Sequence, residues 1–268
     1  MEIIKKCSTV HTYNRGKTKI EYICIHYTAG VSSKPGRAAG TAQYFATTTN
    51  QASADFIVDD GTIVQYNPDP LKYACWAVGG SKYKVTKGGS FYGKCKNMNS
   101  ISIEISSNNK TGKGTYANDP NYYFTDAAVN NAVELTKYLM ELYHIDTDHV
   151  IRHYDVTGKV CPGIIGWNEA SGDISKWLEF KSRIVGGNAV KPVVKTDPNP
   201  IKAFLVKVLI PDLNIRKKPN MDGKVIGQTG KGTFTIVEES GEWGLLKSYS
   251  VNKDGWIYLG NPKYTKRV

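Results

Sequence analysis

Two residue types that bind zinc lie eight positions apart in the segment HYDVTGKVCPG, residues 153–163. The imidazole of His153 and the thiol of Cys161 offer nitrogen and sulfur, the ligands that zinc favours in tetrahedral sites. A catalytic zinc site has three protein ligands and keeps its fourth position for water. The third ligand must come from elsewhere in the chain, and His26, which ends the apolar stretch at residues 20–26, is the best candidate. We therefore predict a zinc site formed by His26, His153 and Cys161.

The same residues allow two other interpretations. A single histidine after an apolar strand and a single cysteine are usually structural residues. Cys161 and His153 could also be the nucleophile and base of a cysteine peptidase. A nucleophilic cysteine is expected near a helix N-terminus, where the dipole lowers its pKa, whereas here a Gly-Lys turn separates the pair and proline follows Cys161. Zinc ligation is the better explanation of the spacing.

The elements that must position these side chains alternate between strand and helix patterns. Apolar and alternating stretches predict strands at residues 20–26, 54–66 (a hairpin that turns at Asp59-Asp60-Gly61), 100–106 and 149–152. Helical spacing of apolar residues predicts helices at 38–48, 125–143 and 173–184, with Thr125 as the N-cap of the second. Strands interleaved with helices predict an α/β fold with a mixed central β-sheet flanked by helices.

A change of composition divides the chain. Residues 186–202 are rich in proline, glycine and small polar residues, which predicts a linker between a first domain at 1–185 and a second at 203–268. After this linker the pattern consists of short strands separated by glycine, proline and asparagine turns. Such regular spacing predicts a small all-β barrel domain.

Composition limits the classes of function. The 268 residues carry a net charge of +11, with a sequence pI of about 9.2, which favours anionic partners without choosing among them. No apolar stretch has the length of a membrane span or of a signal peptide, so we expect no membrane insertion and no secretory signal. Five scattered cysteines do not make a disulfide framework. Nucleic-acid binding is disfavoured because the basic residues form no cluster interleaved with aromatic ones.

Four motifs occur in one order along the first domain: CIHYTAG (24–30), ASADFIVDDGTIVQ (52–65), NSISIEIS (99–106) and HYDVTGKVCPG (153–163). Together they resemble the zinc-dependent N-acetylmuramoyl-L-alanine amidases of the type-2 class, which share their fold with peptidoglycan recognition proteins. The resemblance covers residues 20–185. It implies a hydrolase that uses zinc-activated water to cleave the amide bond between N-acetylmuramic acid and the L-alanine of the peptidoglycan stem peptide.

The resemblance also assigns roles to individual residues. It places the metal ligands on His26, His153 and Cys161, and a catalytic lysine on Lys159. A catalytic acidic residue falls on Glu104, which alternates with isoleucines and so points to the opposite face of its strand. Residues expected to line the substrate groove are Tyr27, Thr28, Trp76 and Asn99. The chain departs from the family pattern at Ala54, where one branch has a catalytic tyrosine, and at Ala77, where relatives often have histidine.

The second domain resembles the bacterial SH3-like wall-binding domain in LNIRKKPN (213–220), GKGTFTIV (230–237), EWGLLKS (242–248) and GWIYLG (255–260). With it, the whole chain resembles a phage endolysin whose partner is the peptidoglycan of Gram-positive cell walls. The implied location is the host cytoplasm until release and the cell wall afterwards. The alternative is a non-catalytic peptidoglycan-binding protein of the same fold, and the oligomeric state stays open.

Overall fold

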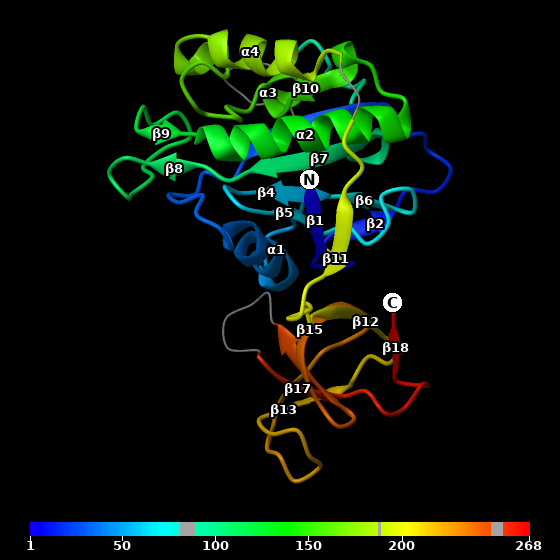
Figure 1. Cartoon of the computed structure of the whole chain (residues 1–268). Coiled ribbons are helices and arrows are strands. Elements are labelled where there is room, and N and C mark those ends of the chain that lie inside the picture. The colour runs from blue at the N-terminus through cyan, green and yellow to red at the C-terminus, as the bar shows by residue number, and fades with distance from the viewer. Residues whose placement is uncertain (81–88, 187–188, 248–253) are drawn as a thin grey trace. The chain divides into compact units, whose positions relative to one another are not determined.

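The computed structural model describes residues 1–80, 89–186, 189–247 and 254–268 (Figure 1). The chain divides into two units. The first contains Met1–Cys7, Thr12–Ala42 and Ala52–Asn199, and the second contains Ser8–His11, Gln43–Gln51 and Pro200–Val268. No helix in the described ranges is both long and apolar enough to cross a membrane.

The first unit is built on a mixed seven-stranded sheet with the order β10-β3-β7-β4-β5-β1-β11. Its strands are β1 (Glu2–Lys5), β3 (Tyr22–Tyr27), β4 (Phe56–Val58), β5 (Ile63–Gln65), β7 (Ser100–Ile105), β10 (Val150–Arg152) and β11 (Val193–Thr196). All neighbours pair in parallel except β4 and β5, which form the predicted antiparallel hairpin. Two small sheets pair β2 (Thr12–Asn14) with β6 (Tyr73–Cys75) and β8 (Asn108–Asn109) with β9 (Tyr122–Tyr123).

The described residues contain four α-helices: α1 (Arg37–Thr47), which the division into units splits after Ala42, α2 (Asp126–Tyr143), α3 (His153–Thr157) and α4 (Ser175–Ile184). Short 3-10 helices lie at Asn97–Asn99, Thr147–His149 and Glu169–Ser171. The α2 helix begins as its sequence predicts, because the Thr125 side chain accepts a hydrogen bond from the backbone N–H of Ala128. In Figure 1, α2 and α4 lie on the same side of the sheet.

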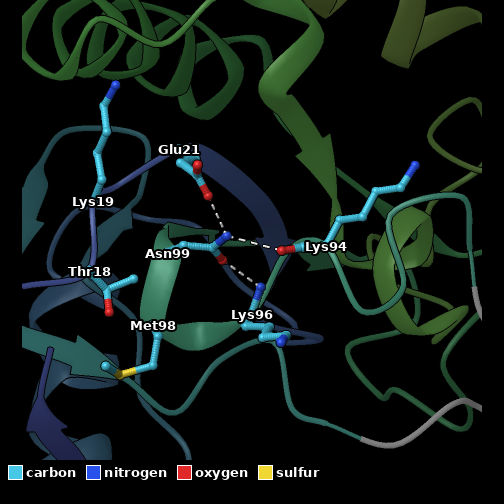
Figure 2. A pocket seen from close by; sticks show the side chains of 7 residues that line it. All are labelled: Thr18, Lys19, Glu21, Lys94, Lys96, Met98 and Asn99. Carbon is cyan, nitrogen blue, oxygen red and sulfur yellow. Dashed lines mark hydrogen bonds between the residues drawn. The ribbon is translucent and has the colours of Figure 1, made fainter.

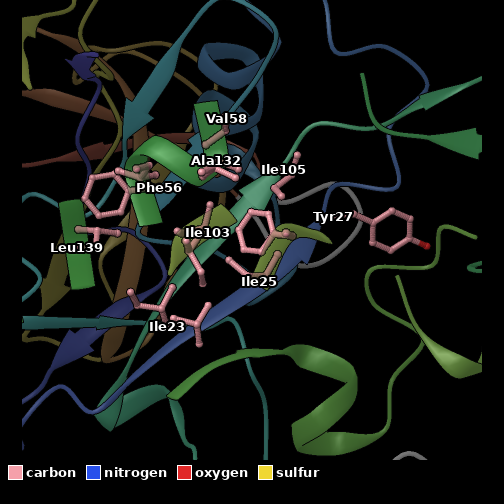
Figure 3. Close-up of a cluster of buried hydrophobic side chains, with 14 of the residues drawn as sticks. Ile23, Ile25, Tyr27, Phe56, Val58, Ile103, Ile105, Ala132 and Leu139 are labelled. Atoms are coloured by element: carbon pink, nitrogen blue, oxygen red, sulfur yellow. The ribbon is translucent and has the colours of Figure 1, made fainter. Parts of the chain in front are cut away.

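The main core lies between the sheet and these two helices. Ile23 and Ile25 of β3 and Ile103 of β7 pack in one buried cluster with residues of α2 and α4 (Figure 3). Since side chains alternate along a strand, the intervening residues of β3 and β7 face the other side. There Cys24 packs with Val156 of α3 in a second, smaller cluster. One face of the sheet is therefore a hydrophobic core, and the other carries the polar side chains of β3 and β7.

The second unit contains a seven-stranded antiparallel sheet with the order β14-β13-β17-β16-β15-β12-β18. The strands are β12 (Phe204–Val208), β13 (Asn214–Arg216), β14 (Val225–Gln228), β15 (Gly232–Ser240), β16 (Trp243–Lys247), β17 (Gly255–Tyr258) and β18 (Thr265–Arg267). Alternating residues such as Val206, Ile236, Leu246 and Ile257 form its core. The predicted fold class, a mixed sheet with helices followed by an all-β domain, is confirmed.

Two features differ from the sequence-based expectations. Strand β11 lies inside residues 186–202, the range predicted to be a linker without regular structure, and pairs in parallel with β1. The segment after β10 begins with a short helix, α3, where the sequence pattern indicated turns. The helix ends at Gly158, whose positive φ of 78° lets the chain reverse. The boundary between the two predicted domains stays a prediction.

Candidate metal centre

Three side chains that are far apart in the sequence converge in the first unit. His26, His153 and Cys161 each offer one ligand atom, and these atoms all lie within 4.8 Å of one another. The imidazole rings of His26 and His153 have centroids 4.7 Å apart, and Nδ1 of His26 lies 3.8 Å from Sγ of Cys161. All three residues are at most 5 % exposed. The structure thus brings together the three predicted ligands.

Strand order explains this convergence. His26 lies near the carboxyl end of β3, and β10 pairs with β3 in parallel, with Arg152 opposite Ile25. The residue after β10, His153, therefore reaches the same end of the sheet. The backbone N–H of Tyr154 donates to the carbonyl of Cys161 over 3.0 Å, which holds the returning chain against α3.

A buried ion pair fixes the start of α3. The Arg152 guanidinium binds the carboxylate of Asp155 and donates to the carbonyl of Trp167, and the Asp155 carboxylate also accepts the backbone N–H of Arg152. Arg152 is only 4 % exposed, so these contacts replace the water that its charge would otherwise require. The residue that follows, His153, is therefore presented from a rigid helix start.

Each imidazole of the cluster carries one buried ring nitrogen without a hydrogen-bond partner among the described residues. Nδ1 of His153 and Nε2 of His26 are buried and accept or donate no hydrogen bond within the described structure. An unpartnered buried polar atom is costly, and a metal ion removes that cost for a nitrogen that binds it. Two imidazoles and one thiol are also the donor set of a catalytic zinc site. The residues present therefore fit a zinc ion.

Burial determines the protonation of the metal-free cluster. It lowers the pKa of His26 well below its usual 6.5, and the nearby charges of His153 and Lys159 act in the same direction. It lowers the pKa of His153 to about 3, again with Lys159 contributing. It raises the pKa of Cys161 to about 12, with Glu104 adding to the rise and Lys159 opposing it. The imidazoles are thus neutral, as metal binding requires, and the thiol needs a cation to lose its proton.

Glu104 lies beside this cluster. It faces His26 in the register of β7 and β3, and its side chain is half-buried, with Oε2 sealed from solvent and without a hydrogen-bond partner among the described residues. Burial raises the pKa of Glu104 to about 8, and the charge of exposed Lys159 opposes that rise. A carboxyl group with such a pKa can both accept and release a proton near neutral pH.

The four predicted groove residues do not all lie together. Tyr27 follows His26, and its hydroxyl donates to the carbonyl of Ala117. Oγ1 of Thr28 accepts the backbone N–H of Ser107, which follows β7, and that of Gly30, each over 3.2 Å. Trp76 is 40 % exposed and packs on Tyr13, with ring centroids 5.1 Å apart.

Asn99 lies at the opposite end of β7 from Glu104, about 16 Å along the strand. Its side chain donates to the Glu21 carboxylate and to the carbonyl of Lys94, and it lines a pocket with Lys19 and Met98 (Figure 2). The structure therefore separates Asn99 from the metal ligands.

Sequence reasoning missed two backbone contacts to the ligands. The backbone of Tyr27 opposes the rise in the pKa of Cys161, and the backbone of Val78 opposes the fall in the pKa of His153. The residue type does not determine a backbone contact, so no motif could have revealed either one.

Comparisons with known proteins agree with this geometry. Residues 16–164 match the family model described as N-acetylmuramoyl-L-alanine amidase. The chain is 24 % identical over 207 residues to the N-acetylmuramoyl-L-alanine amidase CwlL of Bacillus licheniformis, an alignment that covers 71 % of this chain and 49 % of that protein. It is 26 % identical over 270 residues to the N-acetylmuramoyl-L-alanine amidase BlyA of Bacillus subtilis (strain 168), covering 93 % and 68 % of the two chains. The chain thus spans about half the length of CwlL.

Among solved structures, the chain is similar to PlyL. The match has 28 % identity and a TM-score of 0.50 and covers 70 % of this chain and 99 % of that one. A glutamate-to-alanine variant of PlyL matches with 26 % identity and the same TM-score.

Proposed function

The chain belongs to the N-acetylmuramoyl-L-alanine amidase family, and from this premise we propose that it is a zinc-dependent peptidoglycan hydrolase. The bond cleaved is the amide between the lactyl carbonyl of N-acetylmuramic acid and the L-alanine of the stem peptide. The observation that carries this proposal is the buried His26, His153 and Cys161 cluster, which lies beside an unpartnered carboxyl group, that of Glu104.

A zinc ion held by His26, His153 and Cys161 would supply a positive charge that polarises the amide carbonyl and favours deprotonation of water. The protein supplies the orientation of these ligands and the exclusion of bulk water from them, since each is at most 5 % exposed. Both effects strengthen electrostatic interactions at the reacting carbonyl.

Glu104 moves the proton in this proposal. Its carboxylate takes a proton from the attacking water and, once protonated, delivers it to the nitrogen of the leaving L-alanine, so that the C–N bond breaks with a neutral amine as product. The sealed Oε2 and the raised pKa support this role, because a group with a pKa near the working pH can perform both transfers. Lys159 contributes a positive charge near Glu104 and stabilises the negative charge that develops on the carbonyl oxygen.

The second unit is proposed to be a bacterial SH3-like domain that binds the cell wall. Its seven-stranded antiparallel sheet and the resemblance of its strand sequences support this assignment. The whole chain would then act as an endolysin or autolysin on Gram-positive peptidoglycan, present in the host cytoplasm until release and at the cell wall afterwards. Its net charge of +11 suits attachment to anionic wall polymers.

The test is the release of free L-alanine amino groups from purified Gram-positive walls, with the zinc content of each protein measured. Wild type is expected to contain zinc and release L-alanine, His153→Ala to lose both, and Glu104→Gln to keep zinc without releasing L-alanine. Glu141→Gln, an exposed change on α2, is the matched control. Wall binding by a zinc-loaded wild type that releases no L-alanine would instead identify a non-catalytic peptidoglycan-binding protein.

A further inference from the structure

The chain after the ligand Cys161 folds back on itself. The backbone N–H of Trp167 donates to the carbonyl of Ile164 over 3.0 Å, and the side-chain amide of Asn168 donates to the carbonyl of Pro162. Asn168 is fully buried and Pro162 is buried as well, so bulk water does not compete for this bond. One side chain therefore binds the residue that directly follows a predicted metal ligand.

Other contacts hold the same short segment. The carbonyl of Cys161 accepts the backbone N–H of Tyr154 over 3.0 Å, so two successive carbonyls have fixed donors. Gly163 packs against the backbone of Ala117, because an added Cβ there would lie 1.7 Å from the Ala117 carbonyl oxygen. A rotation of the backbone at Cys161 would break these contacts. The direction in which the cysteine side chain leaves the backbone thus depends on them.

The orientation of the Asn168 amide is determined by its two partners. Nδ2 donates to the carbonyl of Pro162, and Oδ1 accepts the backbone N–H of Ser171 over 3.1 Å. A reversed amide would satisfy neither partner, since a carbonyl can only accept and an N–H can only donate. With Oδ1, Asn168 is the N-cap of the 3-10 helix Glu169–Ser171. The amide nitrogen and the amide oxygen therefore have separate roles.

The turn that carries Asn168 is also bound to the segment of a second ligand. Arg152, which directly precedes His153, donates to the carbonyl of Trp167 over 2.8 Å and to the carboxylate of Glu169 over 3.3 Å. Trp167 and Glu169 are the two chain neighbours of Asn168. One hydrogen-bonded support therefore joins the segments that carry two of the three predicted ligands.

We propose that Asn168 is a positioning residue for the metal centre: by holding the carbonyl of Pro162, its amide nitrogen keeps Sγ of Cys161 directed toward the two histidines. This Sγ lies 3.8 Å from Nδ1 of His26. Groups that orient metal ligands through hydrogen bonds contribute to metal affinity although they do not touch the ion. The inference rests on the proposed function insofar as the ion is zinc.

Removal of the amide nitrogen leaves the buried carbonyl of Pro162 without its donor. An unpaired buried carbonyl is unfavourable, so the segment is expected to shift until the carbonyl finds another partner, and Sγ of Cys161 shifts with it. Loss of such a supporting contact typically weakens metal binding by about 10- to 100-fold. Because Asn168 acts through the residue next to the ligand, we expect the lower end, about 10-fold.

Two variants of Asn168 separate the roles of its two amide atoms. Asn168→Ala removes both hydrogen bonds. Asn168→Ser keeps an oxygen that can cap the turn, but its shorter side chain no longer reaches the carbonyl of Pro162. Asn118→Ala is the matched control, because the amide of Asn118 donates to the carbonyl of Ala170 in the same turn over 3.2 Å. This control removes one side-chain hydrogen bond to the turn and leaves the Pro162 contact in place.

The first measurement is the zinc dissociation constant of the full chain, obtained by competition with a chromophoric chelator. We expect it to rise about 10-fold in both Asn168→Ala and Asn168→Ser. In Asn118→Ala we expect it to stay near the wild-type value.

The second measurement is the absorption spectrum of the full chain with Co²⁺ in place of zinc. A thiolate bound to Co²⁺ gives a charge-transfer band in the near ultraviolet, so the intensity of this band per bound ion reports the bond to Cys161. At saturating Co²⁺ we expect the full band in wild type and Asn118→Ala and a loss of intensity in both Asn168 variants. A purely structural role would lower the amount of ion bound and leave the band per bound ion unchanged.

Wild-type zinc affinity and a full band in Asn168→Ser would overturn the proposal, because the capping oxygen would then account for the role of Asn168. Weaker zinc binding with an unchanged band would also overturn it, as would equal weakening in Asn118→Ala. If Asn168→Ala does not fold, Asn168→Ser decides. Neither measurement depends on hydrolysis, so a chain that binds zinc but releases no L-alanine would refute the proposed function and still test Asn168. A wild type that binds Co²⁺ without the thiolate band would refute the inference even if it releases L-alanine.

Discussion

Replacing Glu104 with glutamine should stabilise the metal-free protein near neutral pH while it abolishes hydrolysis. Burial raises the pKa of Glu104 from 4.5 to about 8 in the folded chain. A folded-state pKa above the unfolded one contributes stability that is fully present below pH 4.5 and is lost as the pH rises toward 8. Glutamine has nearly the same shape as glutamate and does not ionise, so the stability of Glu104→Gln does not fall in this way as the pH rises.

The size of the effect follows from the two pKa values. At pH 7 the unfolded chain ionises Glu104 freely, 2.5 pH units above its ordinary pKa of 4.5, while the folded chain keeps it mostly protonated. Each unit corresponds to about 1.4 kcal/mol. Glu104→Gln is therefore expected to be more stable than wild type by about 3 kcal/mol at pH 7 and nearly equal to it at pH 4.

The assay is urea unfolding of chelator-treated protein at pH 4, 5.5 and 7, followed by the helical circular-dichroism signal, which reports the helices before residue 185. Glu141→Gln, an exposed substitution on α2, controls for the loss of one carboxylate and should show no comparable pH-dependent gain. With zinc bound, the gain from Glu104→Gln should shrink, because a nearby cation favours the ionised carboxylate. A stability difference between wild type and Glu104→Gln that does not change from pH 4 to pH 7 would refute the reasoning.

Three other predictions concern the same unit. Burial lowers the pKa of His153 to about 3, so the contribution of its neutral ring to stability is present above pH 6.5 and is lost as the pH falls. Between pH 6.5 and 5, metal-free wild type should therefore lose about 2 kcal/mol of unfolding free energy from this residue. His153→Gln should not show this loss, and urea unfolding at both pH values can check it. Lys159→Ala should lower kcat by up to about 100-fold without changing zinc content, and an unchanged kcat would remove Lys159 from the mechanism. Ile103→Ala, at a fully buried position between β7 and α2, should cost about 3 kcal/mol of unfolding free energy, and a cost below 1 kcal/mol would contradict the packing described.

The longer elements could be predicted from sequence because their patterns are strong. The apolar run of β3 became a strand buried along its whole length, and α2 begins after Thr125 as expected. The exposed strand β11 was not predicted, because a sheet-edge strand with no buried side chain has no hydrophobic pattern. Its backbone pairing with β1 forms this strand. The strand β18 was missed for a similar reason, since only one of its three residues is buried.

The amino-acid sequence by itself determined which donors exist: two imidazoles, a thiol, and a carboxyl group that alternates with isoleucines. The tertiary structure decided which of the candidates share a site. Parallel pairing in register places His26 beside Glu104 and brings His153 to the same end of the sheet, whereas Asn99, in the 3-10 turn just before β7, ends up at the far end. Register and backbone hydrogen bonds depend on the packing of distant segments, and for this reason local sequence patterns cannot specify them.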